Sequence, residues 1–351
     1  MTQPLLTIDL NAVIANWRAL DVLSGSAETG VAVKANGYGC GADKVAAALA
    51  GAGCQSFFVA TIEEGVSLRA ALPKPNIYIL NGVADRRDAT AAIANDLRPC
   101  LNHLGQIDAW RRSEGRACAL QLDSGMSRLG LQFEEWAHVP GGLDVRLMMS
   151  HLSCADEPEH PANEAQRQRF EGGIAALRDR APDALISLAA TGGTLLGEAY
   201  RFDLVRCGVG IYGGHPFELA QPVVSLDTPI LQIRDIPVGQ GVGYGWAWVA
   251  GRPSRVGTLP LGYADGLHRA LSNGATLYFA GKPVPLIGRV SMDLITVDLT
   301  DHPAAAVGDT LEVLGSSQTV DDLAQAAGTI GYEILTSLGQ RYARRYTDAN
   351  A

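Results

Sequence analysis

The chain has 351 residues, of which 47% are hydrophobic and 19% are charged, a composition typical of a folded globular protein and not of a disordered chain. Its formal net charge of -9, without a long basic run, argues against nucleic acid or an anionic membrane surface as a partner. The N-terminus shows no signal-peptide pattern, and no segment has the roughly 18 uninterrupted apolar residues of a membrane span. We therefore expect a cytoplasmic protein.

Eight apolar, β-rich runs follow one another between residue 31 and about residue 213. They are 31–36, 56–60, 76–80, 97–101, 117–122, 144–150, 184–190 and 204–212. Ala-rich stretches with helical spacing lie between most of them, including 42–52, 62–71, 84–95 and 163–178. Strands that alternate with helices in this number predict a (β/α)8 TIM-type barrel rather than an open doubly wound sheet, and no G-x-G-x-x-G fingerprint opens the first helix.

The texture changes near residue 220, where Gly and Pro interrupt short strand-like runs. These runs are 223–226, 229–236, 255–259, 275–279, 294–299 and 310–313, followed by a helix at 319–328 and an interrupted helix at 330–342. We predict two domains. A barrel spans residues 7–218 and a mainly β C-terminal domain spans 219–351, with residues 1–6 joining the second.

The six cysteines are scattered without C-x-x-C pairs in a chain that is too large to need disulfides, so we expect reduced core thiols. Cys40 and Cys207 lie beside the segments discussed below, but their spacing alone is weak evidence of reactivity. No residues have metal-ligand spacing, so we predict no metal site.

A lysine ends the first apolar run, in V-K-A-N-G-Y-G at residues 33–39. Lys34 would lose hydration there, and desolvation lowers the pKa of an amine toward the range in which it acts as a nucleophile or base. The alternative is a strand-end lysine whose ammonium reaches water.

Three later strand ends also carry polar side chains, and catalytic groups of a barrel sit at the carboxyl ends of its strands. Arg128 follows the fifth run and could hold a carboxylate, or could simply pair with a neighbouring acid. His151 follows the sixth run, where a structural role is the alternative to a ligand role. Thr191 and the glycines from Gly208 onward follow the last two runs, the usual phosphate site of a barrel, although glycines alone merely mark turns.

Taken together, these segments resemble those of alanine racemases, the pyridoxal-phosphate enzymes built on a barrel. The resemblance rests on V-K-A-N-G-Y-G at 33–39, H-L-S-C-A-D at 151–156, R-C-G-V-G-I-Y-G at 206–213, G-V-G-Y-G at 241–245, P-L-G-Y-A-D-G at 260–266 and G-R-V-S-M-D at 288–293. It runs from about Leu6 to Tyr346.

The resemblance implies that Lys34 binds pyridoxal 5'-phosphate covalently, with Tyr38 among the cofactor-binding residues. It also implies that Arg206 hydrogen-bonds the pyridine nitrogen, supported by His151. Phosphate binding falls to Thr191, Gly208 and Val209. A permanent cation at the pyridine nitrogen keeps it unprotonated and weakens the electron sink, which favours racemisation over transamination.

By the same resemblance Tyr244 is a second catalytic base that the partner subunit contributes, opposite Lys34. Two bases on opposite faces suit removal of a Cα proton from one side and its return on the other. Arg128, Tyr263 and Met292 would contact substrate or line its entrance. Gln121 departs from the family pattern, in which many members have a carbamylated lysine, and Gln340 stands where some members have a phosphate-binding tyrosine.

The implied activity is interconversion of L- and D-alanine by a homodimer whose active sites are shared between subunits, in the supply of D-alanine for peptidoglycan or in its breakdown. Three alternatives remain open. The substrate could be serine or a broader set of amino acids, and the chain could be a related decarboxylase or a non-catalytic pyridoxal-phosphate carrier. Arg206 argues against the decarboxylase, and the β domain with Tyr244 argues against the carrier.

Overall fold

The computed structural model describes residues 3–347, and the chain divides into two compact units. The barrel unit comprises Val13–Ile211 and Pro216–Ala220. The β unit comprises Met1–Ala12, Tyr212–His215 and Gln221–Ala351.

Eight parallel strands form the sheet of the barrel unit, in the order β8-β7-β6-β5-β4-β3-β2-β9. They are β2 (Glu28–Ala32), β3 (Ser56–Val59), β4 (Asn76–Ile79), β5 (Arg98–Leu101), β6 (Cys118–Gln121), β7 (Val145–Met149), β8 (Leu185–Ser187) and β9 (Leu204–Cys207). The first and last strands, β2 and β9, pair with each other, and a bridge between Ala190 and Arg206 links the segment after β8 to β9. The barrel is therefore nearly closed, which confirms the predicted fold class.

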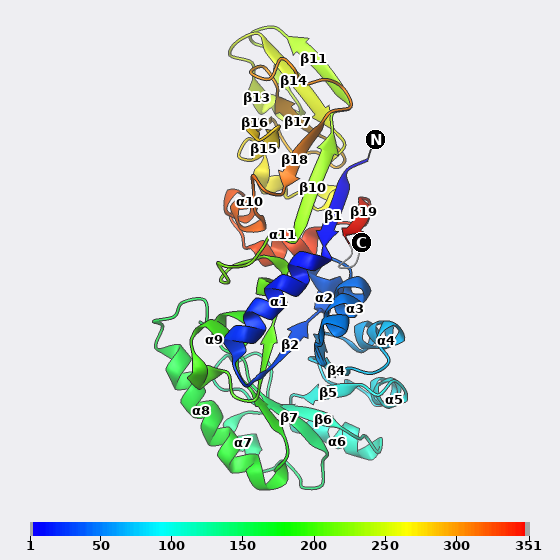
Figure 1. Ribbon diagram of the computed structural model, residues 1–351, viewed down its shortest axis with the longest axis vertical. Helices are drawn as coiled ribbons and strands as arrows, with labels where there is room; N and C mark the ends of the chain where they lie inside the picture. Colours follow the sequence, from blue (N-terminus) through cyan, green and yellow to red (C-terminus); the bar gives the residue numbers. More distant parts are fainter. Residues whose placement is uncertain (1–2, 348–351) are drawn as a thin grey trace. The chain divides into compact units, whose positions relative to one another are not determined.

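Helices precede, connect or follow these strands, and α3 to α6 lie on the outside of the barrel in Figure 1. They are α1 (Leu10–Ser24), α3 (Ala42–Ala52), α4 (Ile62–Ala71), α5 (Arg86–Ala94), α6 (Leu104–Arg112), α7 (Phe133–Trp136), α8 (Ala162–Leu177) and α9 (Thr191–Leu195), with short 3-10 helices η1 (Arg178–Arg180), η2 (Glu198–Tyr200) and η3 (Val209–Tyr212). Helices α3 and α4 have the predicted bounds. Helix α4 begins with a reciprocal capping box between Thr61 and Glu64.

The first predicted strand, 31–36, was wrong at both ends, because β2 begins at Glu28 and ends at Ala32. Val33 makes one more backbone hydrogen bond, donating its N–H to the Phe58 carbonyl at 2.9 Å. The chain then turns in the segment labelled α2 (Lys34–Tyr38), which has left-handed backbone angles. An apolar pattern reports burial rather than φ, so it does not reveal this turn.

The β unit contains a nine-stranded sheet in the order β11-β14-β17-β16-β15-β18-β10-β1-β19. The strands are β1 (Leu5–Asp9), β10 (Val224–Pro229), β11 (Gln232–Ile236), β14 (Ser254–Leu259), β15 (Thr276–Phe279), β16 (Lys282–Ile287), β17 (Ile295–Asp298), β18 (Thr310–Leu314) and β19 (Ala343–Thr347), beside a hairpin of β12 (Gly241–Val242) and β13 (Trp248–Val249). The expected mainly β character is confirmed.

The helical segments of the β unit are α10 (Val320–Ala327), α11 (Gly331–Ser337), η4 (Tyr244–Trp246), η5 (Tyr263–Asp265) and η6 (Arg269–Leu271). The predicted helix at 319–328 is confirmed, with Thr319 as its cap. The interrupted helix at 330–342 was predicted too long, because α11 ends at Ser337. Strand β19 follows this helix and pairs in parallel with β1.

Among residues 3–347, no helix is both long enough and apolar enough to cross a bilayer. All six cysteines lie in the described part of the chain and none of them forms a disulfide; five are buried and Cys154 is partly exposed. Burial raises the pKa of Cys207 to about 12, which leaves it a poor nucleophile at neutral pH.

We expect Gly266→Ala to destabilise the protein by about 2–4 kcal/mol. Gly266 has φ +100°, and a Cβ there would overlap the Ser337 carbonyl oxygen. Gly251→Ala is the control, because a Cβ at Gly251 meets nothing within 4 Å and its φ lies outside the left-handed region. Chemical unfolding of both variants measures the difference, and equal stabilities would contradict the predicted close packing at Gly266.

Candidate active site

Lys34 begins a left-handed turn directly after β2. Ala35, Asn36 and Gly37 have φ between 52° and 62° with ψ near 47°, and Tyr38 follows with φ 51°. Left-handed helical geometry is unfavourable by about 1–2 kcal/mol for each residue with a Cβ, so specific contacts must stabilise the turn. It places Lys34 and Tyr38 at its two ends.

Side-chain acceptors outside and inside the turn supply those contacts. A carboxylate oxygen of Glu64, on α4, accepts the Ala35 N–H at 2.7 Å. The Asn36 side chain accepts the Ala42 N–H at 3.1 Å, and the Asn36 carbonyl accepts the Gly41 N–H at 2.8 Å. The turn is therefore fixed to both α3 and α4.

Burial lowers the pKa of Lys34, and the charges of Arg128 and Arg206 lower it further, while Glu64 acts in the opposite direction. Two cations from other strand ends thus lie close enough to act on the amine. Their combined effect favours the neutral amine, the form that is nucleophilic and basic.

Arg206 lies buried on β9 and holds its guanidinium among uncharged groups. It donates to the Ser187 hydroxyl and the Ser150 carbonyl, both at 2.5 Å, and to the Leu188 carbonyl at 3.3 Å. Within residues 3–347, Arg206 has no ion-pair partner. Burial lowers its pKa to about 10, so the side chain is still a cation at neutral pH.

His151 follows β7, and its Nδ1 lies 3.5 Å from the Arg206 guanidinium. Burial lowers the pKa of His151 to about 3, with further contributions from Arg206, Arg128 and Lys34. The imidazole is therefore neutral, and its Nδ1 lone pair can face the arginine. The structure therefore brings a neutral His151 next to Arg206.

Arg128 is exposed in the loop after β6. Hydrogen bonds from side chains of the same segment fix the shape of this loop. Asp123 accepts the N–H groups of Gly125, Met126 and Ser127 at 2.9–3.1 Å. Gln121 is buried and donates its amide to the Leu129 carbonyl at 3.2 Å. Gln121 thus positions the backbone next to Arg128 without a charge.

Thr191, Gly208 and Tyr38 meet at the carboxyl ends of β8, β9 and β2. The Thr191 hydroxyl accepts the N–H groups of Gly208 and Gly210 at 3.0 and 3.4 Å, which leaves its own O–H available as a donor. A Cβ at Gly208 would come within 2.7 Å of the Tyr38 hydroxyl. Val209 opens η3, where the first amide of a helix has no partner inside it. We call Tyr38, Thr191 and Gly208 the cradle, because hydroxyl groups beside a backbone without a side chain can hold an anion.

The β unit brings the other three predicted residues onto neighbouring loops. Tyr263 and Ala264 donate backbone N–H groups to Ser291 and Met292, and a Cβ at Gly245 would meet the Arg289 guanidinium at 3.3 Å. The side chains of Tyr244, Tyr263 and Met292 are 71%, 44% and 54% exposed. We call these three residues the exposed strip.

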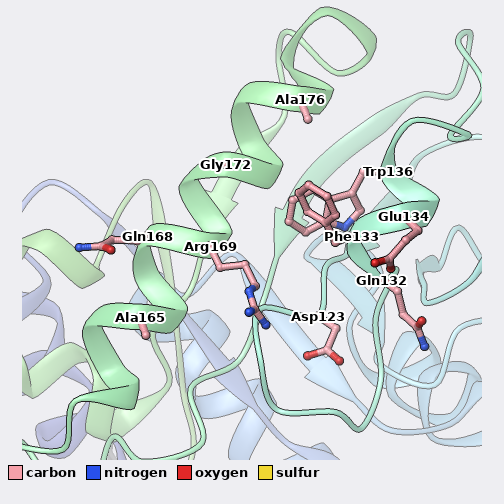
Figure 2. Close-up of a pocket in the computed structure, with 10 residues that line it drawn as sticks. All are labelled: Asp123, Gln132, Phe133, Glu134, Trp136, Ala165, Gln168, Arg169, Gly172 and Ala176. Carbon is pink, nitrogen blue, oxygen red and sulfur yellow. The ribbon is translucent and has the colours of Figure 1, made fainter.

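A separate cavity of about 810 Å³ lies between α7, α8 and the loop at Asp123 (Figure 2). Arg169 extends from α8 toward that loop in the figure. None of Lys34, His151 and Arg206 lines this cavity. We place the candidate active site at the strand ends, where these three residues lie.

Sequence reasoning missed Glu64, Asp123 and the two serines that hold Arg206. The Thr61-x-x-Glu64 spacing predicts a capping box but not the second contact of Glu64 with Ala35. Nothing in the sequence marks Ser150 or Ser187. Within the described residues, His, Cys, Asp and Glu nowhere gather in a group of three or more that could hold a metal ion.

Comparisons with known proteins match nearly the whole length of the chain. Residues 8–216 match the family described as "Alanine racemase, N-terminal domain", and residues 223–346 match "Alanine racemase, C-terminal domain". The alanine racemases of Cereibacter sphaeroides and Dinoroseobacter shibae are 51% and 50% identical over 353 and 355 residues, covering 99% of each chain. The crystal structure of alanine racemase from Bartonella henselae with covalently bound pyridoxal phosphate has a TM-score of 0.93 at 36% identity, covering 99% of this chain and 100% of that one.

We expect His151 to make stability depend on pH. An unfolded histidine has a pKa near 6.5, and the folded value is about 3. Between these values the unfolded chain binds a proton that the folded chain does not, so the contribution is complete above pH 6.5 and is lost as the pH falls toward 3. The test is chemical unfolding at pH 7 and at pH 4.5. Between these two values the free energy of unfolding of the wild type should fall by about 1–3 kcal/mol more than that of His151→Asn.

The control is His138→Asn, because His138 is exposed. It should lose as much stability as the wild type over the same interval. If His151→Asn and His138→Asn behave alike, His151 is not held neutral in the folded protein.

Proposed function

The chain belongs to the alanine racemase family, and we propose that it interconverts L- and D-alanine with pyridoxal phosphate as cofactor. The observation that carries the proposal is the arrangement at the barrel strand ends, where Lys34, with a lowered pKa, lies within the field of Arg206 and Arg128. The cofactor is supported by the covalently bound pyridoxal phosphate of the Bartonella henselae structure.

The residues at the strand ends fit this cofactor. In the cradle, Tyr38 and Thr191 would donate their hydroxyl groups to the phosphate, and Gly208 leaves room for it because it has no side chain. Val209 lies beside the cradle at the start of η3. Lys34 supplies the amine for covalent attachment. Arg206 supplies a buried cation for the pyridine nitrogen, and His151 stays neutral beside it.

Pyridoxal phosphate, when bound, supplies an electron sink that acidifies the Cα–H bond of an amino acid. Lys34 would then take or return the Cα proton at its Nζ, because its environment favours the neutral amine. Tyr244 of the partner subunit would serve the opposite face through its hydroxyl. Arg128 would bind the substrate carboxylate through its guanidinium.

The exposed strip supports a homodimer in which one protomer completes the site of the other. Large exposed side chains on adjoining loops are typical of a surface that contacts another chain. We propose that Tyr244, Tyr263 and Met292 contact the substrate side of the partner's site. We further propose a cytoplasmic enzyme that supplies D-alanine for peptidoglycan or breaks it down.

We expect Gly208→Ala to weaken pyridoxal phosphate binding by about 10- to 100-fold. The added methyl group would lie 2.7 Å from the Tyr38 hydroxyl and would displace it from the phosphate, and one hydrogen bond to a charged group has this effect on affinity. Titration of the cofactor-free protein measures it. Gly51→Ala, where a Cβ meets nothing within 4 Å, should bind normally. Equal affinities for the two variants would remove Gly208 and Tyr38 from the phosphate site.

The function is tested by incubating the purified, cofactor-loaded protein with L-alanine in deuterated water. We expect D-alanine to form and Cα hydrogen to exchange. In Tyr244→Phe, racemisation should fall by about 100- to 10,000-fold, because one of two proton-transfer groups is lost. Exchange should persist with one alanine enantiomer only, since Lys34 still serves its own face.

Tyr278→Phe is the matched control, because Tyr278 lies on β15, in the same unit but outside the exposed strip, and it should be fully active. Exchange without Tyr244 dependence would contradict the two-base assignment. If alanine neither exchanges nor racemises, serine and other amino acids are tested next, and inactivity with all of them would leave a pyridoxal-phosphate carrier.

A further inference from the structure

Glu64 joins two consecutive β/α units through one carboxylate. One oxygen accepts the Ala35 N–H from the turn after β2 at 2.7 Å. The other accepts the N–H groups of Ala60 and Thr61, after β3, at 2.7 and 3.4 Å. Both oxygens are therefore occupied by backbone donors, and the side chain is only partly exposed.

The contact with Ala35 is made where the left-handed geometry of the turn begins. Ala35 is the first residue with left-handed angles and directly follows Lys34. A carboxylate that accepts a backbone N–H forms a short, charge-assisted hydrogen bond, and here it fixes where the left-handed geometry begins. The position of the Lys34 side chain relative to Tyr38 depends on that starting point.

Glu64 is also the acid among the charged groups that act on Lys34. The other charged groups are Arg128, after β6, and Arg206, on β9, while His151 is a neutral neighbour. The carboxylate raises the pKa of the amine, whereas burial and the two arginines lower it. Glu64 therefore limits how far the pKa of Lys34 falls.

We propose that Glu64 is a positioning residue for Lys34, acting through the backbone of the left-handed turn and through its negative charge beside the amine. The proposal rests on the proposed function, in which Lys34 binds pyridoxal phosphate. Glu64 itself contacts backbone groups and acts through Lys34.

The decisive variant is Glu64→Gln, which keeps the shape but replaces one acceptor oxygen by an NH₂ group and removes the charge. One of the N–H groups of Ala35 and Ala60 then loses its acceptor. We expect pyridoxal phosphate to bind roughly tenfold more weakly or worse, measured by absorbance titration of cofactor-free, full-length protein. We also expect attachment to Lys34 to reach its full rate at a lower pH, because attachment needs the neutral amine and the carboxylate no longer stabilises the protonated form.

Three further variants separate the possible causes. Glu63→Gln removes a charge from the exposed neighbour on the same helix turn. Thr61→Ala removes the other half of the α4 capping box and leaves the bond between Glu64 and Ala35 possible. Both should keep the wild-type affinity and pH midpoint. Glu64→Asp keeps the charge on a shorter side chain, so its pH midpoint should return toward the wild-type value while its affinity stays low.

The outcomes distinguish this inference from the proposed function. Borohydride trapping and peptide mass spectrometry of the wild type show whether pyridoxal phosphate attaches to Lys34 at all, and failure there contradicts the proposed function. If the wild type attaches it and Glu64→Gln matches Glu63→Gln in affinity and pH midpoint, the role of Glu64 is overturned. It is also overturned if Thr61→Ala reproduces the whole effect, because the helix cap would then suffice.

Discussion

The buried guanidinium of Arg206 sets the electrostatics of the barrel's functional end. A cation in this place would usually be paired with an acid, but uncharged oxygen atoms of Ser187, Ser150 and Leu188 hold it instead. Its charge is therefore not neutralised locally. It contributes to the lowered pKa of His151 and, with Arg128, to that of Lys34. A buried cation without an ion-pair partner lowers the stability of the fold. A role in binding a ligand with lone pairs therefore explains this arrangement better than a role in stabilising the fold.

The left-handed turn after β2 determines where the side chains at the end of this strand are placed. A strand that simply continued past Ala32 would carry alternate residues to opposite faces of the sheet. The turn instead places Lys34 and Tyr38 at its two ends, with Gly39 also at positive φ and returning the chain toward α3. Contacts with α3 and α4 offset its conformational cost, so the helices that follow β2 and β3, rather than β2 itself, hold the turn in place.

The barrel could be predicted from sequence because most residues of its strands are buried, so that several strands read as largely apolar runs, as in the S-F-F-V of β3. Strand β16 was missed because Pro283 and Pro285 interrupt the pattern, and β19 because its alternation is weak beside the preceding helix. The site residues at strand ends followed from the barrel rule and from the resemblance. Glu64, Asp123 and Ser187 could not be predicted, because their roles are contacts with backbone or side-chain groups that only the fold brings near.

The exposed strip has the properties of a surface that a partner chain covers, whatever chemistry the site performs. Backbone hydrogen bonds from Tyr263 and Ala264 to Ser291 and Met292 fix two of its loops together, so the exposure of these side chains is not the result of a loose segment. Trp246 and Leu294, on the same loops, are also 63% and 42% exposed. Aromatic and aliphatic groups held rigidly in water gain most from burial, and a preorganised surface loses little entropy when a partner covers it. If a partner covers this surface, as proposed above, Tyr263 and Met292 would meet it on loops that are already fixed together, which is the preorganisation that a shared site needs.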